Sequence, residues 1–116
     1  MHETALAQDI VSIISETLER EPLVRLGVVH VAIGEMITVV PELLSHAYNS
    51  IIADTPLQGS VLDIDIIPIT AVCQNCEKSF GLDEYEFLCP HCKSANIYVK
   101  TGNEFYIKEL EVETCP

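Results

Sequence analysis

The spacing of apolar residues predicts two helices in the first half of the chain. From Met1 to about Glu19, apolar side chains recur every three or four residues, which is the period of an amphipathic helix. The positions in this stripe are Leu6, Ile10, Ile13, Ile14 and Leu18. A second helix is predicted from Pro41, because proline is favoured in the first helical turn, and it should end at residues 54–56. Its apolar positions are Leu44, Ala47, Tyr48 and Ile51.

Three other stretches alternate between apolar and polar residues, which predicts β-strands. They run over residues 23–33, 59–69 and 104–112. In the third stretch the apolar phase changes after Ile107, which indicates a β-bulge near Lys108–Glu109. The combined pattern predicts an α+β fold in which two helices cover one face of a three-stranded sheet.

Two Cys-x-x-Cys pairs stand between the second and third predicted strands. The sequence reads C-Q-N-C, then twelve residues, then C-P-H-C, and the cysteines are Cys73, Cys76, Cys89 and Cys92. Four thiolates that converge on one ion form a tetrahedral site, which suits zinc first and iron second. Such a site has no open position, so its metal is structural. A disulfide pair or a thioredoxin-like dithiol fits less well, because a redox site needs one pair in a strand–helix context.

The cysteine motif also divides the chain. We expect a rubredoxin-like zinc-ribbon lobe over residues 71–100, inserted into a discontinuous α/β domain of residues 1–70 plus 101–116. The lobe has little hydrophobic content of its own, so the metal must supply much of its stability. In zinc-finger peptides that contribution is on the order of 10 kcal/mol.

Composition and charge exclude several functions. The 116 residues include eighteen acidic and six basic ones, which argues against nucleic-acid binding because phosphate contacts need clustered lysine and arginine. No apolar run is long enough to span a membrane, and no basic leader precedes an apolar stretch. With the metal-type cysteine pattern, this indicates the reducing cytoplasm. No catalytic triad, open metal triad or phosphate-binding glycine loop is present, so an enzyme is not expected.

The first three residues are a second candidate metal site. The amine of Met1, the amide nitrogen and imidazole of His2 and the amide nitrogen of Glu3 can form a planar four-nitrogen set, which Ni(II) and Cu(II) prefer. The first N–H groups of a helix have no intrahelical acceptor, so their deprotonation breaks no helical hydrogen bond. From composition alone, an exposed terminal histidine is the simpler interpretation of His2.

Taken together, these motifs resemble the HypA/HybF family, the nickel metallochaperones of [NiFe]-hydrogenase maturation. The resemblance covers essentially the whole chain and rests on the initial Met-His-Glu, the helix–strand–helix–strand order, the paired Cys-x-x-Cys motifs and the acidic closing stretch at 105–113. It implies that nickel binds through His2, with the Met1 amine, the backbone of His2 and Glu3, and the Glu3 side chain as a further candidate. It also implies structural zinc at the four cysteines.

The resemblance implies a non-enzymatic carrier as well. Such a protein delivers nickel to the hydrogenase large-subunit precursor together with the GTPase HypB, and some members also serve urease maturation. Two other functions stay open on the residues: a zinc-ribbon interaction module without nickel, and an iron-containing electron carrier. We expect His91 to be an exposed turn residue, His30 and His46 to be structural, and Cys115 to be a free thiol without an assigned role.

Overall fold

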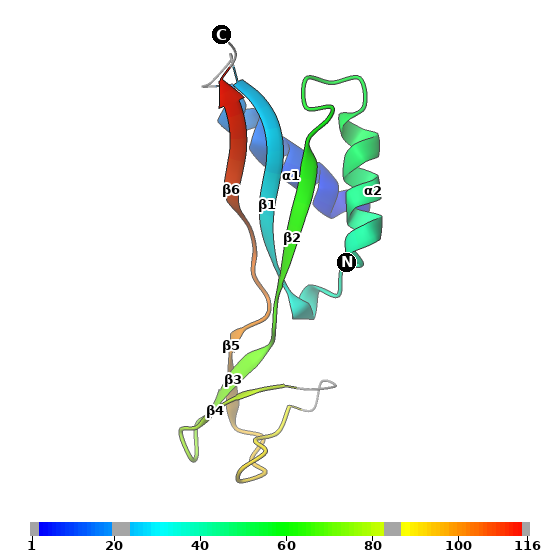
Figure 1. Cartoon of the computed structure of the whole chain (residues 1–116). Coiled ribbons are helices and arrows are strands. Elements are labelled where there is room, and N and C mark those ends of the chain that lie inside the picture. Colours follow the sequence, from blue (N-terminus) through cyan, green and yellow to red (C-terminus); the bar gives the residue numbers. More distant parts are fainter. Residues whose placement is uncertain (1–2, 20–23, 83–86, 115–116) are drawn as a thin grey trace.

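The computed structural model describes residues 3–19, 24–82 and 87–114, and these form two three-stranded sheets that follow one another along an elongated molecule (Figure 1). The molecule measures 59 × 24 × 17 Å along its principal axes. The strand orders are β2-β1-β6 in the first sheet and β4-β3-β5 in the second. The elements are α1 (Glu3–Leu18), β1 (Val24–Gly34), the 3-10 helix η1 (Glu35–Ile37), α2 (Pro41–Ile52), β2 (Val61–Ile67), β3 (Thr70–Cys73), β4 (Ser79–Gly81), β5 (Ile97–Thr101) and β6 (Phe105–Thr114).

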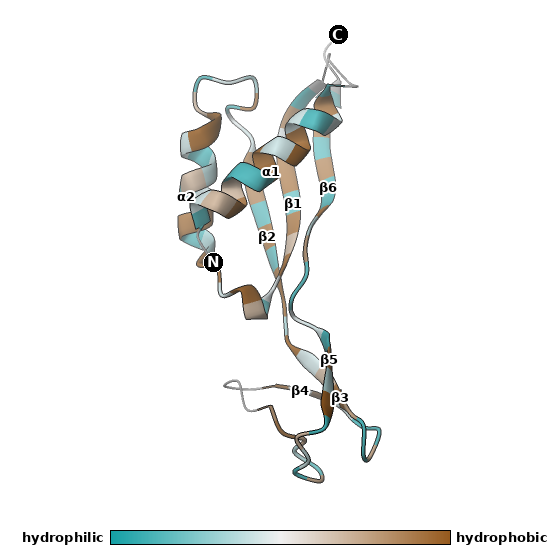
Figure 2. Ribbon diagram, turned by 180° about the vertical axis from the view of Figure 1, so that it is seen from behind, coloured by the Kyte–Doolittle hydropathy of each residue, from teal (hydrophilic) through white to brown (hydrophobic). Residues whose placement is uncertain are grey.

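The predicted α+β class is confirmed, with both helices packed on one face of the first sheet (Figure 2). β1 is the central strand; it runs parallel to β2 and antiparallel to β6. Helix α2 lies in the connection between β1 and β2, because parallel neighbours require a crossover. Among the described residues, no helix is long and apolar enough to cross a membrane.

The core of the first sheet lies between β1 and the two helices. Val29, Val31 and Ile33 alternate along β1 and are fully buried. Each helix buries a row of residues four positions apart, and these rows are Leu6, Ile10 and Ile14 in α1 and Leu44, Tyr48 and Ile52 in α2. Four of the predicted core positions lie outside these rows: Ile13 is 44% exposed, and Leu18, Ala47 and Ile51 are partly buried against the core.

Two β-bulges adjust the first sheet so that apolar residues stay on the helix side. The predicted bulge in β6 is confirmed: His30 pairs with Glu109 and Val31 with Ile107, which leaves Lys108 as the extra residue. A second bulge, which the sequence pattern did not predict, leaves Gly27 unpaired in β1. Each extra residue reverses the alternation once, so apolar residues on both sides of it face the core.

The second sheet begins where the predicted strand 59–69 stops. β2 ends at Ile67 because Pro68 has no N–H to donate to a neighbouring strand. The chain then enters β3, and residues 69–101, which contain the second sheet, are called the cysteine lobe. Its small core consists of the buried residues Ile69, Ala71 and Leu82, with Phe80, Ile97 and Val99 packed against them. That the lobe is an independent domain at the predicted boundaries stays a prediction.

One histidine links all three strands of the first sheet on the face opposite the helices. His30 in β1 contacts Asp63 in β2, with 2.7 Å between Nδ1 and Oδ2, and Glu111 in β6, with 3.3 Å between Nε2 and Oε2. Both ring nitrogens can donate only when the imidazole is protonated. The hydrogen bond to Asp63 raises the pKa of His30 above 6.5, partial burial opposes this rise, and Glu111 adds to it. A second ion pair, between Lys108 and Asp65, lies on the same face at 3.1 Å.

We expect the stabilising effect of His30 to depend on pH. Because its pKa is raised in the folded state, the contribution is complete below 6.5 and is lost as the pH rises through the raised value. The difference in free energy of unfolding between the wild type and His30→Gln should therefore be larger at about pH 6 than at about pH 8.5. Proton NMR titration of the imidazole gives the pKa directly. Asp63→Asn should lower it, and a wild-type midpoint at or below 6.5 would contradict the interpretation.

Candidate metal centre

The four predicted cysteines come together at the far end of the cysteine lobe. All four Sγ atoms lie within 4.8 Å of one another, and none of these cysteines forms a disulfide. The closest pairs are Cys73 with Cys92 at 3.4 Å and Cys76 with Cys89 at 3.6 Å. A tetrahedral zinc site with bonds of about 2.3 Å has sulfur–sulfur edges of about 3.8 Å, so the arrangement fits such an ion. No other cluster of three or more possible ligands occurs among the described residues.

The two Cys-x-x-Cys turns share one backbone conformation. In the first, the Cys73 N–H donates to the carbonyl of Lys78 at 3.0 Å, and the Glu77 N–H donates to the carbonyl of Cys73 at 2.8 Å. The second turn repeats both bonds at 2.9 and 2.8 Å, from Cys89 and Lys93. Glu77 and Lys93, each directly after the second cysteine of a pair, both have φ 63°. Glycine, the usual sequence signal for a left-handed residue, is absent from both turns, so this position could not be predicted.

Backbone N–H groups point at the first sulfur of each turn. The amides of Asn75 and Cys76 both donate to Cys73 Sγ at 3.4 Å. The bond from Cys76 is the main reason why the pKa of Cys73 is lowered to about 6; burial opposes it, and the bond from Asn75 adds to it. These donors stabilise a thiolate, which is the form that binds metal.

In the second turn, backbone N–H groups likewise donate to the first sulfur. Burial raises the pKa of the Cys89 thiol, but hydrogen bonds from the amides of Cys92 and His91 outweigh it, so the net pKa is lowered. The His91 amide lies 3.4 Å from Cys89 Sγ. His91 itself is exposed, as expected. A side-chain bond of 2.7 Å from Asn75 Nδ2 to Ser94 Oγ ties the first turn to the second.

The N-terminal candidate site is only partly within the described residues. Met1 and His2 lie outside them, as does Cys115. Glu3 is the first residue of α1, and its Oε2 accepts a hydrogen bond from the Val40 N–H at 3.3 Å. The carboxylate of this further candidate ligand is therefore already engaged by the chain.

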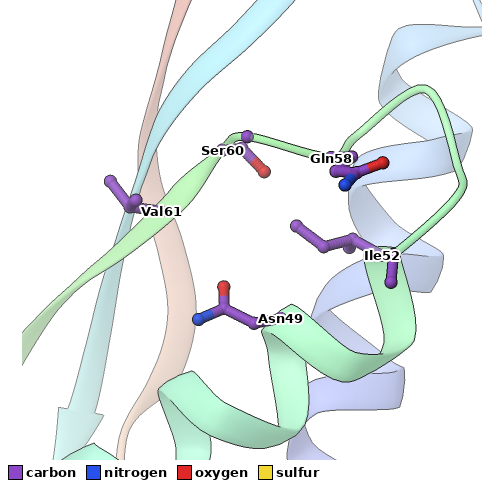
Figure 3. Close-up of a pocket in the computed structure, with 7 residues that line it drawn as sticks. Asn49, Ile52, Gln58, Ser60 and Val61 are labelled. Carbon is purple, nitrogen blue, oxygen red and sulfur yellow. The ribbon is translucent and has the colours of Figure 1, made fainter.

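A hollow of about 300 Å³ lies between the end of α2 and the start of β2 (Figure 3). Its polar groups serve the turn that encloses it. The buried Ser60 hydroxyl donates to the carbonyl of Leu57 at 2.7 Å and lies 2.7 Å from the Tyr48 hydroxyl. Gln58 Oε1 accepts from the Asp54 amide at 3.2 Å. These contacts explain the packing of the turn, and we assign the hollow no chemical role.

Comparison with known proteins gives a consistent result over nearly the whole chain. A family model described as "Hydrogenase/urease nickel incorporation, metallochaperone, hypA" matches residues 1–112. The chain is 38% identical over 118 residues to a hydrogenase maturation factor HypA of Lawsonia intracellularis, covering 97% of this chain and 100% of the relative. It is 34% identical over 113 residues to hydrogenase maturation factor HypA 2 of Bradyrhizobium diazoefficiens, with the same coverage.

Two solved structures share the fold. The solution structure of the Ni metallochaperone HypA from Helicobacter pylori aligns with a TM-score of 0.68 at 22% identity, covering 98% of this chain and 99% of that one. A further solution structure of HypA protein aligns with a TM-score of 0.71 at 23% identity and covers 97% of each chain. At this level of identity, the two alignments show the common architecture.

The left-handed residues in the two turns predict a stabilising substitution. A residue with a β-carbon is disfavoured in this conformation by about 1–2 kcal/mol, which glycine avoids. Because glycine also gains entropy in the unfolded chain, we expect Lys93→Gly to stabilise the zinc-loaded cysteine lobe by only about 1 kcal/mol. Urea unfolding followed by zinc release to a chromogenic chelator measures this. Lys78→Gly, next to the other left-handed residue but without a positive φ of its own, should destabilise the lobe. If Lys93→Gly and Lys78→Gly change the stability of the lobe equally, glycine does not relieve backbone strain at residue 93.

Proposed function

Because this chain belongs to the HypA family, as its motifs predicted, we propose that it binds Ni(II) at its N-terminus and delivers the ion during [NiFe]-hydrogenase maturation. The observation that carries this proposal is the match to the nickel-incorporation family over residues 1–112, which includes the Met-His-Glu start. The family is one of metallochaperones, so the protein acts as a carrier and not as an enzyme.

The proposed nickel ligands are the Met1 amine, the His2 imidazole and the backbone nitrogens of His2 and Glu3. Helix α1 begins at Glu3, so the Glu3 amide is in the first turn and has no intrahelical acceptor to lose. The Glu3 carboxylate is a further candidate ligand, and to bind nickel it must give up its bond to the Val40 amide. Nickel is the cargo of this site, and a planar set of nitrogen donors suits its preferred geometry.

The proposed role of Cys73, Cys76, Cys89 and Cys92 is to hold a structural Zn²⁺ ion. Their sulfur–sulfur distances suit a tetrahedral ion, and backbone hydrogen bonds to sulfur favour the thiolate form of Cys73 and Cys89. With four protein ligands the ion has no open position for a substrate. Zinc therefore maintains the shape of the lobe, and the N-terminus carries the exchangeable metal.

The proposed partners follow from the family. They are the GTPase HypB and the hydrogenase large-subunit precursor, and in urease-producing cells the urease maturation proteins, since the family description names both enzymes. The formal net charge of −12 argues against nucleic acid as a partner. Four thiolates kept free of disulfides suit the cytoplasm, where we place the protein.

A specific observation supports a second candidate function. The cysteine lobe is complete without nickel, so the protein could act as a zinc-ribbon interaction module alone. The two functions differ in what they require at residue 2, because only the carrier depends on His2 and on a free N-terminus. An iron-containing electron carrier would differ from both by its visible absorption, since Zn²⁺ has a filled d shell.

A nickel titration of the tag-free, zinc-loaded protein tests the nickel site. We expect the wild type to bind one nickel ion per chain, and both His2→Ala and a variant extended before Met1 to lose this ion. His46→Ala, on the exposed face of α2, is the matched control and should bind as the wild type does. If all four proteins bind nickel alike, the N-terminal site is wrong and the interaction module becomes the better proposal.

Nickel affinity should fall on mild acidification. The unperturbed imidazole titrates near pH 6.5 and the α-amine near 8, so protons compete with nickel for both groups between about pH 7.5 and 6. Isothermal titration calorimetry across this range measures the effect, and zinc content measured in parallel shows whether the cysteine site stays loaded. An affinity that does not change across the range would be inconsistent with a site made of these two donors.

A further inference from the structure

Three segments of the chain meet where the two sheets join, and we call this region the neck. It consists of residues 34–36, where β1 passes into η1, and of the two connections between the sheets, 67–70 and 101–104. Figure 1 shows that β2 continues into β3 and β5 into β6 at this level, with η1 beside them. The orientation of the cysteine lobe therefore depends on the contacts made within the neck.

The backbones of the neck touch directly. A β-carbon on Gly34 would overlap the carbonyl carbon and oxygen of Gly102. Gly102 has φ +119°, and a β-carbon there would lie 2.9 Å from Ile69 Cα. Both positions need glycine because no side chain fits between the segments. Close packing of this kind leaves little space for one connection to slide past the other.

Backbone hydrogen bonds join the end of β1 to the returning connection. The Gly34 N–H donates to the carbonyl of Glu104 at 2.7 Å, and the Met36 N–H donates to the carbonyl of Gly102 at 2.7 Å. Glu104 Oε1 in turn accepts from the Gly102 N–H at 2.7 Å. The start of η1 is thus fixed to the segment that leads from β5 to β6.

Two threonines join the outgoing connection to the returning one. The Thr101 hydroxyl donates to the carbonyl of Pro68 at 2.8 Å. Its oxygen lies 2.6 Å from the Thr70 hydroxyl, which can donate to it. The two connections are therefore bonded to each other on the side where they enter the cysteine lobe.

Glu35 completes the neck by binding the outgoing connection. Its Oε1 accepts a hydrogen bond from the Ile69 N–H at 3.0 Å, across 34 positions of sequence. Ile69 is 3% exposed and belongs to the small core of the lobe, whereas Glu35 is exposed. Pro68 has no N–H, so Ile69 carries the first backbone donor after β2. A hydrogen bond to a charged acceptor is stronger than one between neutral groups.

We propose that Glu35 is a positioning residue that locks the cysteine lobe in one orientation relative to the first sheet. The glycine contact and the backbone bonds hold the returning connection, and the Glu35 carboxylate holds the outgoing one. Glu35 lies between Gly34 and Met36, whose amides bond the returning connection, so its carboxylate ties the outgoing connection to the same point of the chain. The lobe and the helix-covered sheet then present themselves to a protein partner as one rigid surface.

The same segment also reaches the first helix. After η1, the Thr38 N–H donates to the carbonyl of Glu35 at 3.1 Å, in a left-handed residue with φ 55°. Two residues later the Val40 N–H donates to the Glu3 carboxylate at 3.3 Å. Residues 34–40 therefore form a brace between the neck and the start of α1. That this brace relates the cargo to the lobe rests on the proposed nickel site.

Residual dipolar couplings of the full-length, zinc-loaded protein without nickel test the lock. In the wild type, the amides of both sheets should fit a single alignment tensor. Glu35→Ala should give two different tensors, and its Ile69 amide should exchange with solvent ~10-fold faster because its acceptor is lost. Glu35→Gln keeps an acceptor oxygen and should restore the single tensor. Glu42→Ala, an exposed acidic residue of α2, is the matched control and should behave as the wild type does.

Three results would overturn the proposal: two tensors in the wild type, one tensor in Glu35→Ala, or the same behaviour in Glu35→Gln as in Glu35→Ala. A nickel titration of the same samples separates this proposal from the proposed function. If the NMR signals of the α1 amides near Glu3 do not change with nickel, the proposed nickel site is wrong. The alignment tensors still test whether Glu35 fixes the orientation of the lobe. If they respond, the shifts should reach Ile69 in the wild type and stop before the neck in Glu35→Ala.

Discussion

Four sulfur atoms must meet at one point, and the layout of the chain follows from that requirement. The first cysteine pair begins at the end of β3 and the second precedes β5, and because β5 runs antiparallel beside β3, the two pairs meet at the same end of the second sheet. The return places β6 next to β1, where it completes the first sheet. The cysteine lobe has only a small apolar core. A metal ion bound by the four sulfurs would therefore supply stability that the larger apolar core supplies in the first sheet.

The two proposed metal sites differ in how firmly they should hold their ions, as their functions require. A resident zinc ion needs four ligands held by backbone geometry, and the repeated bonds of the two turns supply this. A cargo ion needs ligands that can release it, and a terminal amine and an imidazole compete with protons near neutral pH. The proposed zinc ligands lie in the cysteine lobe, and the proposed nickel ligands are the first three residues of the chain. Residues 34–40 bond to both regions, through Glu35 to Ile69 of the lobe and through Val40 to Glu3 at the start of α1.

The distribution of charged residues bears both on the stability of the first sheet and on which partners the protein can bind. The open face of the first sheet carries ion pairs in which His30 and Lys108 each compensate acidic neighbours. These pairs hold β1, β2 and β6 together on the side that has no helices. The surplus of acidic residues over the whole chain favours protein partners and metal cations over nucleic acid.

The sequence by itself determined the features that depend on neighbouring residues. The 3.6-residue and two-residue periods predicted both helices and the three strands of the first sheet, and the change of phase after Ile107 predicted the bulge at Lys108. The spacing of the cysteines predicted a four-sulfur site, and the Met-His-Glu start led to the family. Only the tertiary structure decided which residues far apart in the chain touch. The Gly34–Gly102 contact, the bond from Ile69 to Glu35 and the two partners of His30 depend on strand register and close packing, which no local pattern records.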